Sequence, residues 1–416
     1  MANITEAQQK EFKLTSTKGV YIQQVMPNSS AAKAKFTSGD VLIALNNKPI
    51  ESVQQFIPMI RTFQAGDKIE LTYYRKGKKR IQKLVFQELP RIKNDRHEVI
   101  YGSIKAKNNH LRTVITKPKG KGKFPAVVLV QGVGCVTLDN PGVWFYHALA
   151  DSLTSKGMVV MQIEKTGMGD SKGTPCRECS FEEEVEGYKQ GLLALKKMPE
   201  VDANQLFMIG FSMGGVIAPV VAKDIPVKGI IAYGTVGRNW AEYEMENSRR
   251  QAEMAGTPYD QIAQTMRLKA RALHHMMGEK IPQKDLLAKY PELASFVNFY
   301  PQSYGYFQTV GDLNLAEYWL KTDAHVLMIH GAGDFLSFGK DHDLIAKIVN
   351  KKSPGKGTYM ELPNSDHWLN NVSTMQESLQ VVQQRSRVEK NYQFNSIVAK
   401  WILDKLDNKA LGSKDK

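Results

Sequence analysis

The stretch Gly210-Phe211-Ser212-Met213-Gly214 decides the fold of this sequence. Residues 205–209 (QLFMI) before it read as a buried strand, and residues 215–222 after it begin as a helix. A serine on so sharp a strand-to-helix turn presents its Oγ outward, above the N-terminus of the helix. Glycines two residues to either side let the strand and the helix approach without clashes between Cβ atoms. The pattern therefore predicts that Ser212 is a nucleophile at the edge of a sheet.

Strands and helices alternate on both sides of this turn. We expect a hairpin at 97–106 and 110–117, strands at 126–130, 158–163, 205–209, 229–233, 325–330 and 358–362, and helices at 143–155, 181–198, 213–223, 340–350 and in a last segment ending near 406. This rhythm is typical of the α/β class with a doubly wound, mostly parallel sheet. Residues 238–321 interrupt it with charged helical sequence, and a segment of that length predicts an inserted helical lid.

Residues 97–409 resemble an α/β-hydrolase, a fold shared by esterases and serine aminopeptidases. In that fold the nucleophile, acid and histidine follow one another along the chain, and the last two lie in loops after late strands. The acid candidate is Asp334, which follows the apolar run 326–329, although it could instead cap the next helix. The histidine candidate is His367, directly after the last strand. The resemblance thus implies a Ser212–His367–Asp334 triad.

The resemblance also implies two backbone donors for a negatively charged oxygen that develops during the reaction. One is the N–H of Met213, next after the nucleophile, and the other is that of Val133 or Gly134 in the loop after strand 126–130. A glycine-rich loop at a strand end could instead hold a phosphate. The dinucleotide fingerprint fails here because Thr137 stands where its third glycine belongs. The mechanism requires neither a metal nor an organic cofactor.

The expected lid contains the candidates for substrate binding, Trp240, Tyr243 and Phe307, although such aromatics could equally form the lid's own core. An apolar lid favours a small-molecule ester as the substrate. A short peptide is the alternative, because the fold resembles serine aminopeptidases. A substrate with a free amine would call for a lid carboxylate, and the chain offers Glu242, Glu244 and Glu246.

Residues 5–88 carry a second resemblance. The segments Gly19–Ile22, Asn28–Ala32, Gly39–Leu42 and Asn46–Ile50 are similar to the PDZ domains of bacterial HtrA-type proteases, and a polar linker at 89–96 follows them. The resemblance implies a protein or peptide ligand bound along a strand edge. In such domains the carboxylate-binding loop and the docking strand precede the segment equivalent to 4–14. Either this domain has lost that mode of binding, or the sequence starts after the true N-terminus.

Composition limits the remaining classes of function. The 416 residues suffice for two domains, and a net charge of +14 raises the question of nucleic-acid binding. The densest basic clusters, 75–80 and 117–123, surround glycines like solvated hairpin tips and contain no interleaved aromatics, so we expect no nucleic-acid ligand. No apolar run is long enough to span a membrane. As written, the chain has no signal peptide and is expected in the cytoplasm, or in the periplasm or outside the cell if its true N-terminus is missing.

The three cysteines are too few for a disulfide framework, and Cys176 and Cys179 with Cys135 cannot supply the four ligands of a structural zinc site. Cys135 in the glycine-rich loop could approach Cys176 at the rim of the site. A disulfide between them is a hypothesis that requires an oxidising compartment. A non-catalytic, PDZ-bearing scaffold is the alternative to an enzyme, and the presence of all three triad residues argues against it.

Overall fold

The computed structural model describes residues 1–27, 29–88, 91–92, 94–140, 145–297, 302–384 and 386–406. The chain divides into two units, Met1–Lys93 and Asn94–Lys416, so the division falls within the expected linker. Residues 89, 90 and 93 of that linker, and residues 407–409 of the expected hydrolase domain, lie outside the described residues. The two units are described separately below.

The first unit is a small antiparallel sheet with three short helices. Its strands follow the order β1-β2-β3-β5-β6, with β4 on β3; they are β1 (Ala2–Asn3), β2 (Val20–Tyr21), β3 (Val41–Leu45), β4 (Lys48–Pro49), β5 (Lys68–Arg75) and β6 (Lys78–Val85). The helices are α1 (Glu6–Glu11), α2 (Ser30–Lys33) and α3 (Val53–Arg61). Alternate apolar residues of β5, among them Ile69, Leu71 and Tyr73, form the core with α3.

The two basic clusters, residues 75–80 and 117–123, lie in different kinds of connection between strands. Residues Lys76 and Gly77 both have positive φ and connect β5 to β6, so the first cluster lies at a hairpin tip, as expected. The expectation is wrong for the second cluster. It connects β8 (Asn109–Lys117) to β9 (Phe124–Val130), and these strands are not neighbours because β10 (Val159–Ile163) lies between them. The sequence pattern could not reveal this crossover.

The second unit contains an eight-stranded sheet in the order β14-β13-β12-β11-β9-β10-β8-β7. Its other strands are β7 (Glu98–Ala106), β11 (Val201–Phe211), β12 (Gly229–Tyr233), β13 (His325–Gly331) and β14 (Gly357–Leu362). The strands from β9 to β14 pair in parallel, and β7 and β8 form an antiparallel hairpin that joins β10. The sheet confirms the expected mostly parallel α/β architecture.

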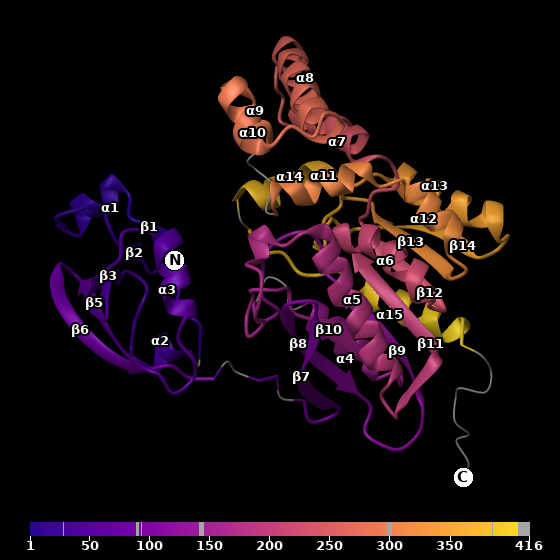
Figure 1. Ribbon diagram of the computed structural model, residues 1–416, viewed down its shortest axis with the longest axis horizontal. Helices are drawn as coiled ribbons and strands as arrows, with labels where there is room; N and C mark the ends of the chain where they lie inside the picture. Colours follow the sequence, from indigo (N-terminus) through magenta and orange to yellow (C-terminus); the bar gives the residue numbers. More distant parts are fainter. Residues whose placement is uncertain are drawn as a thin grey trace. The chain divides into compact units, whose positions relative to one another are not determined.

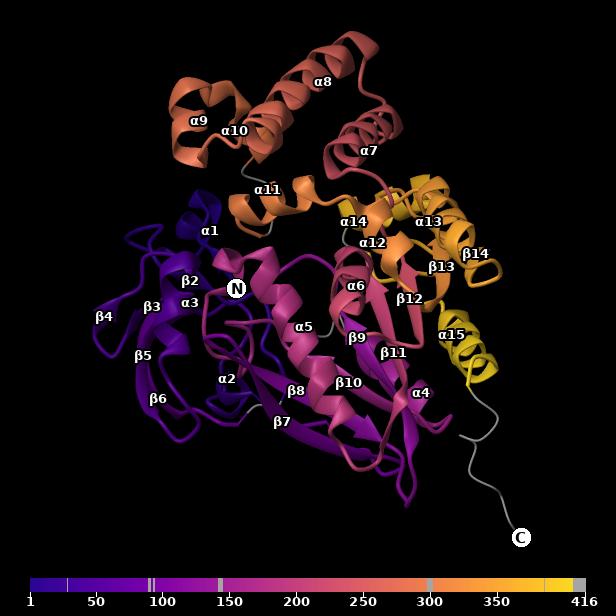
Figure 2. The same cartoon turned by 45° about the vertical axis from the view of Figure 1, so that its right-hand side comes forward.

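Helices cover both faces of this sheet (Figures 1 and 2). Along β9, Val127 and Leu129 point to a core formed with α4 (Phe145–Thr154) and α15 (Gln393–Asp404), whereas Val128 and Val130 point to the opposite core. That opposite core includes α5 (Phe181–Lys196), α6 (Met213–Asp224) and α13 (Gly339–Lys352). The strand β9 is therefore apolar on both of its faces, as in buried parallel sheets. The helix α14 (Met375–Gln384) was not expected as a separate element.

The described part of the segment between β12 and β13 contains helices joined by short turns and no strand. Its helical elements are α7 (Trp240–Met254), α8 (Tyr259–Leu273), a π-helical turn (His274–Gly278), α9 (Gln283–Lys289), a 3₁₀ turn (Pro291–Leu293), α10 (Ala294–Val297), α11 (Tyr304–Asp312) and α12 (Leu315–Lys321). In both views α7, α8, α9 and α10 lie further from the sheet than α11 and α12 (Figures 1 and 2). Within the described residues, no helix combines the length and the apolar character needed to cross a membrane.

Candidate active site

Ser212 lies on a strained turn between β11 and α6. Its φ is +53° and its ψ is −118°, a conformation that costs a residue with a side chain of the order of 1–3 kcal/mol. The neighbouring glycines make the turn possible. A Cβ on Gly210 would lie 2.4 Å from the carbonyl carbon of Gly214, and a Cβ on Gly214 would lie 2.2 Å from the Val130 oxygen. The sequence thus forces the half-buried Ser212 side chain out of the sheet at its carboxyl edge.

Asp334 and His367 form a hydrogen-bonded pair. Nδ1 of His367 lies 2.8 Å from Oδ2 of Asp334. Asp334 is fully buried and also accepts hydrogen bonds from the Ser337 hydroxyl and from the N–H groups of Leu336 and Ser337. Asp334 therefore orders its own loop as well as orienting the imidazole. The expected alternative, a simple helix cap, does not describe it, because Phe338 is the residue at the cap of α13.

The environment of the pair shifts both pKa values in opposite directions. Burial alone would raise the pKa of Asp334, but the adjacent His367 and the hydrogen bonds hold it well below its ordinary value. Burial alone would lower the pKa of His367, and the charge and hydrogen bond of Asp334 outweigh burial and raise it. The pair therefore favours an ionised Asp334 and stabilises a protonated His367.

Gly234 and its neighbour Tyr233 locate the pair and the serine along the same edge of the sheet. Gly234 directly follows β12, and a Cβ there would lie 3.0 Å from Nδ1 of His367 and 3.2 Å from Oδ2 of Asp334. The backbone N–H of Ser212 donates to the oxygen of Tyr233, next to Gly234. Ser212 and the pair thus meet at adjacent strand ends. Among the described residues, no hydrogen bond joins the Ser212 hydroxyl to His367, and such bonds tighten when substrate binds.

The glycine-rich loop after β9 reaches Ser212 from the other side. A Cβ on Gly132 would lie 3.2 Å from the Cβ of Ser212. The N–H groups of Val133 and Gly134 donate to no other group that the structure describes. Met213 begins α6, so its N–H has no partner within the helix. Within the described part of the chain, the N–H groups of the three expected oxyanion donors therefore have no acceptor, and they lie in segments that adjoin the serine.

A buried lysine holds this loop, and the sequence did not predict it. Nζ of Lys165 donates to the Gly132 oxygen at 2.7 Å and forms an ion pair with Oε1 of Glu184 at 2.7 Å. The Tyr306 hydroxyl donates to the other Glu184 oxygen at 2.9 Å. The only signal in the sequence was a lysine placed two residues after the strand that ends at Ile163. Its partners come from distant segments, which no local pattern connects.

The hypothesised disulfide is present in the structure. Cys135 and Cys176 are bonded, with their Cα atoms 5.8 Å apart, and Cys179 is a buried free cysteine. Because Cys135 follows Gly134 directly, the bond anchors the end of the glycine-rich loop to the 3₁₀ turn Cys176–Glu178. A small cavity of about 20 Å³ beside it, lined by Lys165, Glu184, Cys176 and Cys179 among others, has room for about one water molecule.

The three expected substrate-binding aromatics lie together in a core. The ring centroid of Trp240 lies 4.9 Å from that of Tyr243 and 5.4 Å from that of Phe307. Phe307 is 1% exposed, and all three belong to the large core on the α5 and α6 face of the sheet. Within the described residues, the indole N–H of Trp240 has no hydrogen-bond partner. A role in substrate binding stays a prediction for these residues.

Comparisons with known proteins agree with the two units. Residues 140–354 match the family model for "Serine aminopeptidase, S33", and residues 6–84 match the model for the PDZ domain. Esterase EstD of Thermotoga maritima is 25% identical over 245 residues, which are 58% of this chain and 54% of EstD. The periplasmic serine endoprotease DegP of Salmonella typhimurium is 45% identical over 69 residues, which are 17% of this chain and 14% of DegP. The chain thus spans only part of the length of these relatives.

Solved structures with a similar arrangement include esterases. One from Pyrococcus furiosus has a TM-score of 0.49 and 16% identity, covering 76% of this chain and 97% of its own. Est1E from Butyrivibrio proteoclasticus, with ferulic acid bound, has a TM-score of 0.46 and 13% identity, covering 73% and 98%. The serine aminopeptidase model covers more than half of the 416 residues. The chain, with its N-terminal PDZ domain, therefore belongs to the serine aminopeptidase S33 family of α/β-hydrolase enzymes.

Proposed function

We propose that the protein hydrolyses a carboxylic ester through an acyl-enzyme on Ser212. The observation that carries the proposal is the His367–Asp334 pair, with 2.8 Å between Nδ1 and Oδ2, packed against Gly234 beside the strained Ser212 turn. A serine hydroxyl is a weak nucleophile near neutral pH and needs a base that is held in the correct tautomer. Since Nδ1 of His367 bonds to Asp334, its Nε2 is the atom available to take the serine proton.

The proposed reaction has two halves that balance. Oγ of Ser212 attacks the ester carbonyl while Nε2 of His367 takes its proton, and the same nitrogen then protonates the departing alcohol. Water next gives a proton to His367 as its oxygen attacks the acyl carbon. The carboxylic acid leaves when Ser212 regains that proton. The N–H of Met213 and that of Val133 or Gly134 would stabilise the oxyanion in both halves, at about 3–4 kcal/mol for each donor.

The lid carboxylates favour an ester over a substrate with a free amine. Glu242 and Glu246 both pair with Arg238, and Glu246 also pairs with Lys340. Glu244 is buried and pairs with Nζ of Lys269 at 2.5 Å. A carboxylate that already neutralises a basic side chain attracts a substrate ammonium less strongly. The similarity to EstD supports the ester reading, and a short peptide, suggested by the family's description, is the alternative.

Labelling with a fluorophosphonate probe tests the nucleophile, with wild type and Ser212→Ala compared in parallel. We expect labelling of the wild type only, and we expect the variant to lose turnover of p-nitrophenyl acetate and butyrate by a factor of the order of 10⁴ or more. Labelling without ester turnover would redirect the proposal to aminoacyl and peptide substrates. A folded wild type that resists the probe would overturn the triad and favour the scaffold alternative.

The compartment and the PDZ partner form a second proposal. A bond between Cys135 and Cys176 needs an oxidising environment, and the PDZ segment is similar to that of periplasmic endoproteases. We therefore expect the protein to work in such a compartment and its PDZ domain to bind a protein or peptide. Cell fractionation followed by alkylation of free thiols tests this. Recovery of the protein with its cysteines reduced in the cytoplasm would contradict it.

A further inference from the structure

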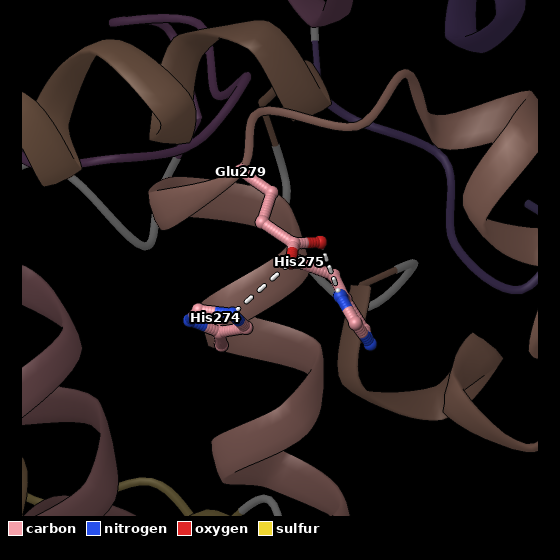
Figure 3. Close-up of side chains that lie close together, drawn as sticks. All are labelled: His274, His275 and Glu279. Carbon is pink, nitrogen blue, oxygen red and sulfur yellow. Dashed lines mark hydrogen bonds and ion pairs between the residues drawn. The ribbon is translucent and has the colours of Figure 1, made fainter.

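Two histidines and a glutamate converge where α8 ends. Figure 3 shows the side chains of His274 and His275 on either side of Glu279. Nδ1 of His275 lies 2.7 Å from Oε2 of Glu279, and Nε2 of His274 lies 3.2 Å from Oε1. One ligand atom from each of the three residues lies within 4.8 Å of the other two.

The π-helical turn is what brings this set together. At 3.6 residues per turn, residues five apart in an α-helix differ by about 140° around the axis and face different directions. Here the Glu279 N–H donates to the His274 oxygen, so the two residues close a five-residue π turn and face the same side. His275 reaches Glu279 at the ordinary spacing of four. Such single π turns occur frequently at functional sites.

The set has the ligand types of one common zinc site, and its ligand atoms lie near one another. Two imidazoles and one carboxylate are the protein ligands of one common zinc site, in which water completes the tetrahedron. With bonds of about 2.1 Å, ligand atoms of a tetrahedral zinc lie roughly 3.4 Å apart. The two imidazole nitrogens lie 2.7 and 3.2 Å from different oxygens of Glu279, and one ligand atom of each residue lies within 4.8 Å of the other two, so side-chain rotations would bring the three to that spacing. The His274 side chain is 64% exposed, which leaves the ion a route from solvent.

The surroundings are compatible with a bound cation. The nearest basic residues along the chain have acidic partners, since Arg271 pairs with Glu292 and Lys280 pairs with Asp312. The ring of Tyr290 stacks on His275 with 4.7 Å between centroids, which fixes the orientation of that imidazole. Within the described residues, no other group of three or more histidine, cysteine, aspartate or glutamate side chains has its potential ligand atoms this close together. The group includes none of the proposed triad residues.

We propose that His274, His275 and Glu279 bind a divalent transition-metal ion of the zinc type, with water in the open position. The ion would cross-link the end of α8 to the turn that leads into α9. It would therefore stabilise this part of the helical segment without taking part in ester cleavage. The site is independent of the function proposed for Ser212.

Calorimetric titration of chelator-treated protein with Zn²⁺ tests the site, together with the visible absorption of added Co²⁺. We expect saturable binding near one ion per chain and the strong absorption typical of tetrahedral Co²⁺ in the wild type. His274→Ala and Glu279→Gln remove exposed ligands, so both should fold and each should weaken binding at least tenfold, which is the loss expected even from residues that only orient ligands. Zn²⁺ should raise the thermal midpoint of the wild type and not of these variants.

His110→Ala is the matched control, because His110 is exposed and lies on β8 outside the cluster. It should bind the ion like the wild type. Binding that is unchanged in His274→Ala and Glu279→Gln would place the ion elsewhere and overturn the proposal. An absence of saturable binding to the wild type would overturn it as well. Circular dichroism of each variant separates loss of a ligand from loss of the fold.

Discussion

His367 acts as a base only while its imidazole is neutral, so its pKa determines the pH dependence of the proposed reaction. The neighbouring Asp334 outweighs the effect of burial and raises that pKa above the ordinary value near 6.5. We expect kcat/KM to rise with pH and to level off only above that raised pKa. Asp334→Asn removes the charge, so the midpoint should move to lower pH and kcat should fall about 10⁴-fold, as in other triads. pH–rate profiles of both proteins measure these changes.

Asp170→Asn controls for the general loss of an acidic residue, since Asp170 is exposed and its carboxylate lies 3.9 Å from Arg112. Its pH–rate profile should match that of the wild type.

The free energy of unfolding should also depend on the raised pKa of His367. A histidine whose folded pKa is raised stabilises the fold fully below the unfolded pKa, and that contribution is lost as pH rises through the folded pKa. Identical pH midpoints of the kcat/KM profiles of the wild type and Asp334→Asn would contradict the assigned His367–Asp334 pair.

At the level of elements, the sequence predicted what local patterns encode. The apolar runs predicted the strands β9 to β14. The glycines around Ser212 predicted the strand-to-helix turn, because the close approaches of the backbone there leave no room for a Cβ atom. It also predicted that Asp334 and His367 follow the last two strands of the sheet, and they lie after β13 and β14. It could not predict the Lys165–Glu184–Tyr306 contacts, because these depend on the packing of α5 and α11 against one loop. The π turn was missed for a similar reason, since no local signal distinguishes it from a continuing α-helix.

The disulfide joins two loop elements, and its removal should therefore weaken the hydrolase unit. Closing a loop between cysteines 41 residues apart stabilises a fold by about 4 kcal/mol in the chain-entropy model. We expect Cys135→Ser, or reduction of the wild type, to lower the midpoint of chemical unfolding, and to lower kcat because Cys135 adjoins the oxyanion loop. Denaturant titrations with and without a phosphine reductant measure the first effect, and ester turnover measures the second.

Cys179→Ser is the matched variant, because Cys179 is buried and takes no part in the bond. It should remain as sensitive to the reductant as the wild type. Titration of denatured, non-reduced protein should find one free thiol in the wild type and none in Cys179→Ser. Three free thiols in the wild type would show that the bond does not form.

At the scale of the whole molecule, the two units have separate hydrophobic cores. The core of Val20, Leu42 and Phe56 belongs to Met1–Lys93, whereas the two cores on either face of the parallel sheet belong to Asn94–Lys416. Among the described residues, none of these hydrophobic clusters contains residues of both units. Each unit has its own hydrophobic core, as a domain that folds alone does.

A chain reduced to residues 94–416 should therefore fold and keep its kcat/KM for p-nitrophenyl acetate within about twofold of the full chain, because Ser212, Asp334 and His367 all lie in this unit. Its thermal midpoint should match one transition of the full chain, and residues 1–93 alone should account for the other. Turnover and scanning calorimetry of the three proteins measure this. A soluble, folded 94–416 fragment without turnover would mean that the PDZ domain contributes to the reaction itself, and peptides that alter turnover of the full chain would then identify its ligand.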